Sequence, residues 1–402
     1  MKRSSLPARE GGTPVRNEDR FLVFGQPVIG PEEIRAVVEC LESRWVGTGP
    51  RVQQFETAFA ARQDARHAVA VASCTAGLHL SLLALGLKAG DEVITTSLTF
   101  CSTVNAIIHS GAHPVLADCD LDSMNMDAAA IERCITSRTK AIIVVHLYGR
   151  PCEMDAIMAL AAKHGLSVIE DCAHAIEATY CGRPMGSFGA LGCFSFYVTK
   201  NVTTVEGGMV ITADDALADK IKILGLHGLS QDAWRRFSDP GYIQYEVIAP
   251  GFKYNMTDLQ AALGLVQLGR IGANAERRAK IWNTYLGAFA DLPCILPTPC
   301  PPHMTHALHL FTPLIQTERL RISRDEILDA LTAENIGLGV HYLPVSQHRY
   351  YRETYGFVDG DFPNAESIGA RTLSLPLSGA LSDQDVGDVC EAFSRVLRHY
   401  SL

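Results

Sequence analysis

The sequence lacks several features that mark special classes of protein. None of its twelve cysteines forms a C-x-x-C pair, and their scatter favours reduced thiols over a disulfide framework. No apolar run is long enough to span a bilayer, and residues 1–20 lack the apolar core of a signal peptide. The formal net charge is −9, which argues against a nucleic-acid-binding protein. We therefore expect a cytoplasmic protein with no nucleic-acid or membrane partner and no bound metal ion.

The sequence does have ample apolar material for a large folded core. Of its 402 residues, 47% are hydrophobic and 20% are charged, which is a globular composition. The polar segment 1–20 is an exception, and we expect it to be a poorly ordered tail.

Strand and helix patterns alternate along the first half of the chain. Buried strands are predicted for "HAVAVAS", "DEVITTS", "HPVLAD", "KAIIVVHLYG" and "LSVIED", each followed by a helical or turn pattern, with further strands at 193–197 and 207–212. This alternation is typical of an α/β fold whose mainly parallel sheet is covered by helices. A Pro-rich stretch and a different pattern follow. We predict a large domain over 21–274 and a smaller C-terminal α+β domain over 275–402.

Three polar features follow buried strands, where ligands bind in open parallel sheets. Thr75 and Ala76 begin a helix in "ASCTAGLHL", so their backbone N–H groups offer a phosphate cradle. Asp171 ends "SVIED" and Lys200 follows "CFSFYV". Taken singly, each has an ordinary explanation: a helix cap by Ser73 or Thr75, another helix cap, and a surface lysine.

One cofactor uses all three features together. Pyridoxal 5′-phosphate (PLP) needs a lysine for its aldehyde, an acid for its pyridine nitrogen and a helix N-terminus for its phosphate. Phe100 follows another predicted strand and could stack on the ring, although it could equally be a core residue. The sequence therefore predicts a PLP site with Lys200 as the nucleophile.

The sequence resembles the DegT/StrS-type nucleotide-sugar aminotransferases, which have the aspartate-aminotransferase fold. The resemblance lies in "GDEVITTSLTF", "VVHLYGRPCEMDAI", "GFKYNMTDLQAALGLVQL" and the segment from "EDCAHAIEATY" to "TKNVTTVEGGMV". One departure is Cys74, where family members commonly carry glycine; a positive φ at that position would strain a cysteine.

The resemblance implies a role for each matching residue. Lys200 matches the lysine that bonds to the cofactor, and Asp171 matches the acid on the pyridine nitrogen. Four further contacts are implied: His174 beside the ring hydroxyl, Phe100 against the ring, and both Ser195 and the pair Thr75–Ala76 at the phosphate. Asn255 matches an asparagine that reaches the phosphate in a neighbouring subunit, which implies a homodimer with shared active sites.

The resemblance also implies the reaction and its substrates. The activity would be transamination from glutamate to a keto-sugar nucleotide, with C4 of a UDP-4-keto sugar as the best match. "RWVGTGP" and "GVHYLPV" resemble segments that line the sugar site, which makes Thr48 and His341 candidate substrate contacts. His341 could instead be a strand residue packed at a domain interface.

Two alternatives remain open at this stage, and the sequence argues against a third. One is an aminotransferase acting on a dTDP-keto sugar or a cyclitol ketone. Another is a non-catalytic PLP-fold sensor or binding protein. A nicotinamide oxidoreductase would need G-x-G-x-x-G after the first strand, and "GTGPRV" at 47–52 has the wrong spacing.

Overall fold

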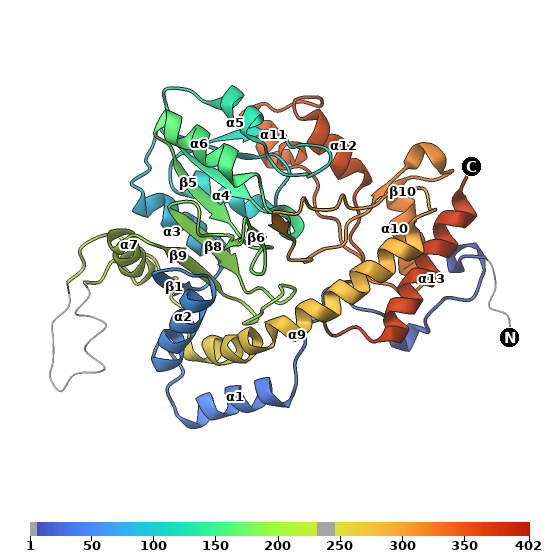
Figure 1. Ribbon diagram of the computed structural model, residues 1–402, viewed down its shortest axis with the longest axis horizontal. Helices are drawn as coiled ribbons and strands as arrows, with labels where there is room; N and C mark the ends of the chain where they lie inside the picture. The colour runs from blue at the N-terminus through green and yellow to red at the C-terminus, as the bar shows by residue number, and fades with distance from the viewer. Residues whose placement is uncertain (1–5, 231–245) are drawn as a thin grey trace.

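The computed structural model describes residues 6–230 and 246–402 and is built on a seven-stranded sheet (Figure 1). In spatial order the strands are β1 (His67–Val71), β9 (Gly208–Thr212), β8 (Leu191–Ser195), β5 (Ser167–Asp171), β4 (Thr139–Val145), β2 (Glu92–Thr96) and β3 (His113–Ala117). Strands β8, β5, β4, β2 and β3 are parallel, whereas β9 runs antiparallel to both of its neighbours. The prediction of an α/β fold with a mainly parallel sheet is confirmed.

Helices cover both faces of this sheet because the strands are apolar on both faces. One face packs against α3 (Cys74–Ala84), α4 (Cys101–His109) and α7 (Asp215–Gly225). The other face packs against α2 (Pro50–Arg62), α5 (Ala128–Cys134), α6 (Met154–His164) and the first part of α9 (Asp258–Phe289). Residues that follow β2, β5 and β8 are thereby brought to one edge of the sheet.

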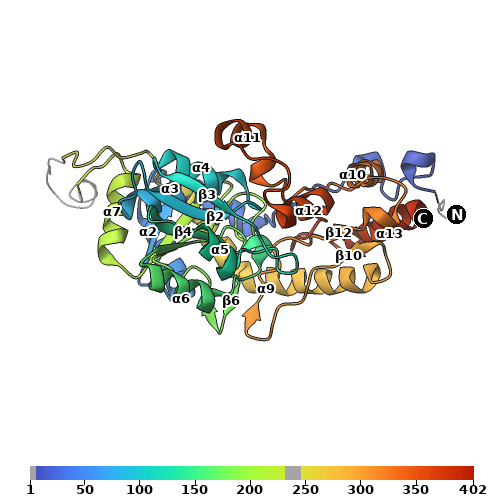
Figure 2. The ribbon, with the colours of Figure 1, turned by 90° about the horizontal axis from the view of Figure 1, so that it is seen from above.

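Helix α9 is continuous for 32 residues and links the sheet to the C-terminal part of the chain (Figure 2). A separate hydrophobic cluster, called here the C-terminal cluster, contains Ile281 of α9 and residues of α10 (Arg324–Ala333) and α13 (Asp383–Tyr400). The described chain also contains the helices α1 (Pro31–Glu42), α11 (Arg349–Tyr355) and α12 (Pro363–Arg371). Its remaining strands are short: β6 (Thr179–Tyr180), β7 (Arg183–Pro184), β10 (Cys294–Ile295), β11 (Met304–Thr305) and β12 (Leu314–Ile315). The division of the chain at residue 274 stays a prediction, and α9 passes through that position without a break.

The N-terminal segment differs from the expected poorly ordered tail over residues 6–20. Val15 is buried in the C-terminal cluster, and its N–H donates to Glu334 Oε2 at 2.7 Å. Arg16 pairs with Asp385 and Asp388 at 2.7 Å each. A polar composition did not predict this order because the segment is held by carboxylates more than 300 residues away. Residues 1–5 lie outside the described residues.

Two further observations bear on the sequence predictions. All twelve cysteines lie in the described parts of the chain and are free thiols. Over residues 6–230 and 246–402, the structure has no helix that combines the length and the apolar character needed to cross a membrane.

Candidate active site

Lys200 lies in the loop after β8, where its N–H donates to the carbonyl of Tyr197 at 2.9 Å. Burial of its ammonium lowers the pKa of Lys200 to about 8, although Cys74 and Asp171 nearby act in the opposite direction. Loss of a proton is therefore much easier for this amine than for a solvated lysine. The ordinary explanation of Lys200 as a surface charge does not fit this environment.

Asp171 ends β5 and is buried, with 4% of its surface exposed. Its Oδ1 accepts from the N–H of Ala173 at 3.1 Å and its Oδ2 from the hydroxyl of Thr103 at 2.9 Å. Burial raises the pKa of Asp171, and these two hydrogen bonds and the charge of Lys200 oppose that shift. Both oxygens are thus held in fixed directions within the field of the lysine.

His174 follows Asp171 in a buried loop, and its tautomer is fixed by its partners. The N–H of Tyr148 donates to Nδ1 at 3.1 Å, and Nε2 lies 3.2 Å from the hydroxyl of Tyr342. Burial and the nearby Lys200 hold the pKa of His174 well below its usual value, so the ring is neutral. Because Nδ1 accepts, Nε2 carries the proton and donates to Tyr342.

Phe100 lies at the end of the β2–α4 loop with 55% of its surface exposed. Its ring centroid is 5.9 Å from that of Tyr342. The alternative that Phe100 belongs to the core is therefore wrong, and its exposed ring is available to stack on a planar ligand.

The N-terminus of α3 offers one of the two predicted phosphate donors. Ser73 caps the helix by accepting from the N–H of Ala76 at 3.1 Å. Among the residues that the structure describes, no group accepts from the N–H of Thr75. Ser195, at the end of β8, accepts from the N–H of Tyr197 at 3.3 Å. Its hydroxyl hydrogen remains available to an anion.

Cys74 is compatible with its position despite the glycine common in the family. It is the first residue of α3, and its φ is not positive. Its thiol faces Oδ1 of Asp171 at 3.9 Å. The expected strain does not occur, because a helical backbone at the start of α3 accepts any side chain.

Asn255 and Thr48 lie together, although they were predicted for different ligands. The amide Nδ2 of Asn255 donates to Thr48 Oγ1 at 2.6 Å, and that hydroxyl donates to the carbonyl of Met256 at 2.5 Å. Both side chains are only partly buried. One surface therefore carries the candidate contact to a neighbouring subunit and the candidate contact to the sugar.

His341 lies close enough to Lys200 for the charge of the lysine to act on its pKa. Its Nδ1 lies 2.7 Å from the hydroxyl of Ser374, and its ring centroid is 5.6 Å from that of Phe24. Burial and the charge of Lys200 lower the pKa of His341 to about 4, so the ring is neutral near pH 7. His341 is not in a strand: the segment around it has one isolated bridge, from Gly339 to Ser374.

Sequence reasoning missed several polar residues of this site. Tyr342 bridges Phe100 and His174, and its place in the quoted "GVHYLPV" segment could have drawn attention to it. Thr103 lies one helical turn beyond Phe100 and reaches Asp171. Asn201 and His309 carried no local signal, since they meet only through tertiary packing.

The chemistry of these side chains fits PLP. A partly buried amine of lowered pKa and an anchored carboxylate each act on the pKa of the other. An exposed aromatic ring and an uncapped helix N–H lie at the same edge of the sheet. In PLP, the amine suits the aldehyde and the carboxylate suits the pyridine nitrogen. The aromatic ring suits the planar ring of the cofactor, and the helix N–H suits its phosphate.

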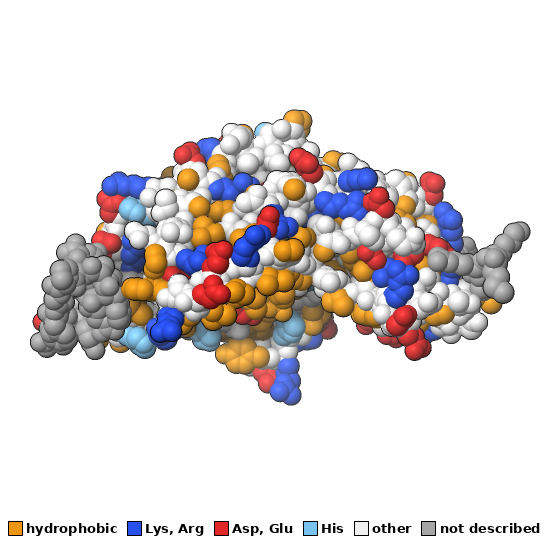
Figure 3. Space-filling model, turned by 90° about the horizontal axis from the view of Figure 1, so that it is seen from below, with side chains coloured by type: hydrophobic (Ala, Val, Ile, Leu, Met, Phe, Trp, Pro, Cys, Tyr) orange, Lys and Arg blue, Asp and Glu red, His pale blue; other side chains and the backbone are white. Residues whose placement is uncertain are grey.

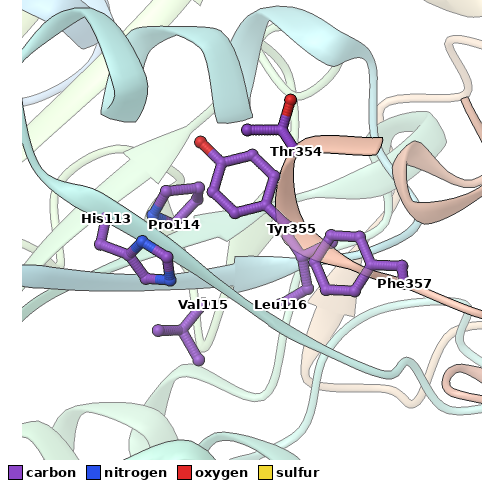
Figure 4. A pocket seen from close by; sticks show the side chains of 7 residues that line it. All are labelled: His113, Pro114, Val115, Leu116, Thr354, Tyr355 and Phe357. Carbon is purple, nitrogen blue, oxygen red and sulfur yellow. The ribbon is translucent and has the colours of Figure 1, made fainter. Parts of the chain in front are cut away.

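Two other features of the described chain do not form part of this site. A pocket beside β3 is lined by His113, Pro114, Val115, Leu116, Thr354, Tyr355 and Phe357, and none of the candidate residues lines it (Figure 4). A buried group of His146, Glu170 and Cys172 has the donor types of a metal site. Glu170 is already occupied by His146 Nε2 and by the N–H groups of Gly186, Phe188 and Gly189. This second group therefore holds the core together.

Comparisons with known proteins agree with the chemistry of the site. Residues 27–394 match the DegT/DnrJ/EryC1/StrS aminotransferase family. The spore coat polysaccharide biosynthesis protein SpsC of Bacillus subtilis is 49% identical over 385 residues, which cover 96% of this chain and 99% of SpsC.

Solved structures of sugar aminotransferases share the fold. The PLP-form of the putative sugar aminotransferase Spr1654 from Streptococcus pneumoniae superposes with a TM-score of 0.87 at 31% identity, covering 94% of this chain and 99% of Spr1654. DesI, solved in the presence of its TDP-sugar product, superposes with a TM-score of 0.83 at 31% identity, covering 97% of each chain. The chain therefore belongs to the DegT/DnrJ/EryC1/StrS aminotransferase family and is a PLP-dependent sugar aminotransferase.

Proposed function

We propose that the enzyme transfers the amino group of glutamate to a keto-sugar nucleotide, with C4 of a UDP-4-keto sugar as the acceptor. The observation that carries the proposal is the partly buried amine of Lys200, with its lowered pKa, near the anchored carboxylate of Asp171. The likeness of the segment around His341 to sugar-binding segments supports the choice of sugar. A dTDP-keto sugar is the second candidate, because DesI was solved with a TDP-sugar product.

In this proposal each residue holds or moves a specific group. Bound PLP supplies an aldehyde that exchanges amines and a ring that draws electrons from the reacting carbon. Lys200 Nζ accepts the proton from Cα of the amino donor and later returns one to the sugar carbon. Asp171 holds the pyridine nitrogen, because Thr103 and Ala173 fix both of its oxygens. The products are 2-oxoglutarate and an amino sugar nucleotide.

The remaining candidates bind and orient in this proposal. Ser195 and the N–H of Thr75 hold the phosphate, with Ala76 in the same helical turn. Phe100 stacks on the ring, and His174 lies beside the ring hydroxyl with its Nε2–H directed at the hydroxyl of Tyr342. Thr48 and His341 contact the sugar nucleotide, His341 as a neutral ring beside Lys200.

A substrate panel tests the proposed reaction. We expect the PLP-loaded enzyme to lose its visible absorbance when glutamate is added and to regain it with a UDP-4-keto sugar. Matched panels would contain UDP- and dTDP-keto sugars and inosose ketones, each followed by absorbance and by mass spectrometry of the amino product. Turnover confined to dTDP-keto sugars or inososes would contradict the preferred substrate.

We also propose a homodimer that shares its active sites, and the outer surface of α1 (Pro31–Glu42) supports it. Ile34, Val38 and Leu41 lie on one helical face but are 60%, 44% and 52% exposed, whereas Glu33 on the other face is buried. Trp45 and Val46 extend this apolar surface toward Thr48. Figure 3 shows hydrophobic side chains gathered on the side of the molecule that carries α1. A stripe of this kind is typical of a face that another chain covers.

Mixing two inactive variants tests the shared site. In Lys200→Ala the site loses its amine, and in Asn255→Ala it loses the amide that would reach the partner's phosphate. If the two residues act in the same site from different subunits, a refolded equal mixture should recover about a quarter of wild-type activity, because half of random dimers contain one intact site of two. Recovery of no activity would contradict sharing, and a monomeric mass in solution would contradict the dimer.

A further inference from the structure

A buried polar network lies beside Lys200 and includes none of the residues that the sequence predicted for the site. Arg278 of α9 forms an ion pair with Oε1 of Glu177, and the two side chains are 3% and 10% exposed. Oε2 of Glu177 accepts from Nδ2 of Asn201 at 2.6 Å. Both carboxylate oxygens therefore accept, and Glu177 has no proton to donate in this network.

The network fixes the orientation of the Asn201 amide. Besides Glu177, Nδ2 of Asn201 also donates to the carbonyl of Ala307 at 3.1 Å. With its NH₂ group directed at two acceptors, Asn201 must present its carbonyl Oδ1 to Nδ1 of His309, which lies 3.0 Å away. A carbonyl only accepts, so His309 must carry a proton on Nδ1.

The other ring nitrogen of His309 is then an acceptor. Burial and the charges of Lys200 and His341 hold the pKa of His309 well below its usual value, so the ring carries one proton, on Nδ1. No described residue donates a hydrogen bond to Nε2. Nε2 is nevertheless not one of the described side-chain atoms that are both inaccessible to solvent and without a hydrogen-bond partner. It therefore opens onto accessible space in a residue that is 4% exposed. The ring of His174 lies 4.5 Å away and has the opposite tautomer.

We propose that Glu177, acting through Asn201, fixes His309 as the Nδ1–H tautomer, so that Nε2 accepts a hydrogen bond from an O–H or N–H group of the sugar substrate beside Lys200. The substrate part of this inference rests on the proposed function. His309 contacts the substrate, and Glu177 is a positioning residue. A neutral acceptor that is otherwise unpaired discriminates against a sugar lacking a donor at that position, because the acceptor then stays unsatisfied.

Nitrogen-15 NMR of the PLP-loaded enzyme tests the tautomer without any turnover. In ¹⁵N-histidine-labelled protein, the signals that disappear in His309→Asn should show a protonated Nδ1 and an unprotonated Nε2. His306 is a matched internal control with the opposite expected tautomer, because its Nδ1 accepts from the N–H of Leu308 at 2.8 Å. A proton on Nε2 of His309 in the wild-type enzyme would overturn the proposal.

Glu177→Gln tests the positioning role. Arg278 should retain the single remaining carbonyl oxygen, so the new NH₂ group would face the NH₂ group of Asn201. Asn201 should then turn over and donate to Nδ1 of His309, which moves the ring proton to Nε2. The tautomer of His309 should reverse while that of His306 stays unchanged. An unchanged His309 tautomer in Glu177→Gln would exclude Glu177 as the residue that sets it.

Half-reaction kinetics test the substrate contact. Asn at position 309 can reproduce the Nδ1 donor but not the Nε2 acceptor. His309→Asn and Glu177→Gln should each lower kcat/KM for the keto sugar about tenfold, the effect of one lost hydrogen bond. The glutamate half-reaction should change less than about twofold. An equal loss of rate in both half-reactions, or no loss in either, would contradict a contact between His309 and the sugar. If the wild-type enzyme accepts glutamate but no keto sugar, the proposed function fails, and the NMR result still decides the tautomer.

Discussion

Lys200→Ala should lower transamination by about four orders of magnitude, at the upper end of the contribution of a positioned acid–base group. The structure gives the reason: Lys200 is a partly buried amine whose pKa falls to about 8, close to a working pH. The variant should also lose the visible absorbance of covalently attached PLP. Single-turnover rates with glutamate and absorbance spectra of the PLP-incubated protein measure the two effects.

The matched control for this variant is Lys163→Ala. Lys163 lies on α6 with 63% of its side chain exposed and pairs with Glu132 at 2.7 Å. Its removal should leave activity, absorbance and stability unchanged, because exposed ion pairs contribute little. Full activity in a correctly folded Lys200→Ala protein would contradict the role assigned to this amine.

Asp171→Asn should lower transamination by about a thousandfold, as expected when a buried charge that stabilises the reacting system is removed. Asparagine keeps the size of the side chain and one acceptor for Thr103 or Ala173. The neutral amide no longer favours a proton on the pyridine nitrogen, so the ring becomes a weaker electron sink. Single-turnover kinetics with glutamate measure the loss, and the midpoint of thermal unfolding should change little.

Glu170→Gln is the contrasting control, one residue earlier in the same strand. Glu170 accepts from the N–H groups of Gly186, Phe188 and Gly189 at 2.7–2.8 Å. An amide NH₂ directed at these donors should destabilise the fold by about 1–3 kcal/mol. Near-wild-type catalysis in Asp171→Asn, or lost stability there without lost catalysis, would show that Asp171 has only a structural role.

The sequence predicted best those features that depend on short segments. Asp171 ends one buried strand and Lys200 lies in the short loop after another, so the alternation of strands and helices was enough to place them at one edge of the sheet. The sheet itself was predicted for the same reason. The antiparallel direction of β9 was harder to predict, because the sequence shows only that no helix separates β9 from β8.

Features built by distant segments could not be read from the sequence. Helix α9 runs without a break through residue 274, where we predicted the end of the large domain. The contact of Asn255 with Thr48 joins residues more than 200 positions apart. The same holds for Glu177 with Arg278 and for Asn201 with His309, which are more than 100 positions apart. A local pattern contains no record of such partners.

A crystal structure of the PLP-loaded enzyme tests the central claim most directly, because that claim concerns the two ends of one cofactor. We expect continuous electron density from Nζ of Lys200 to the cofactor and a carboxylate oxygen of Asp171 within hydrogen-bond distance of the pyridine nitrogen. Density joining PLP to another lysine, or a pyridine nitrogen directed away from Asp171, would contradict the account.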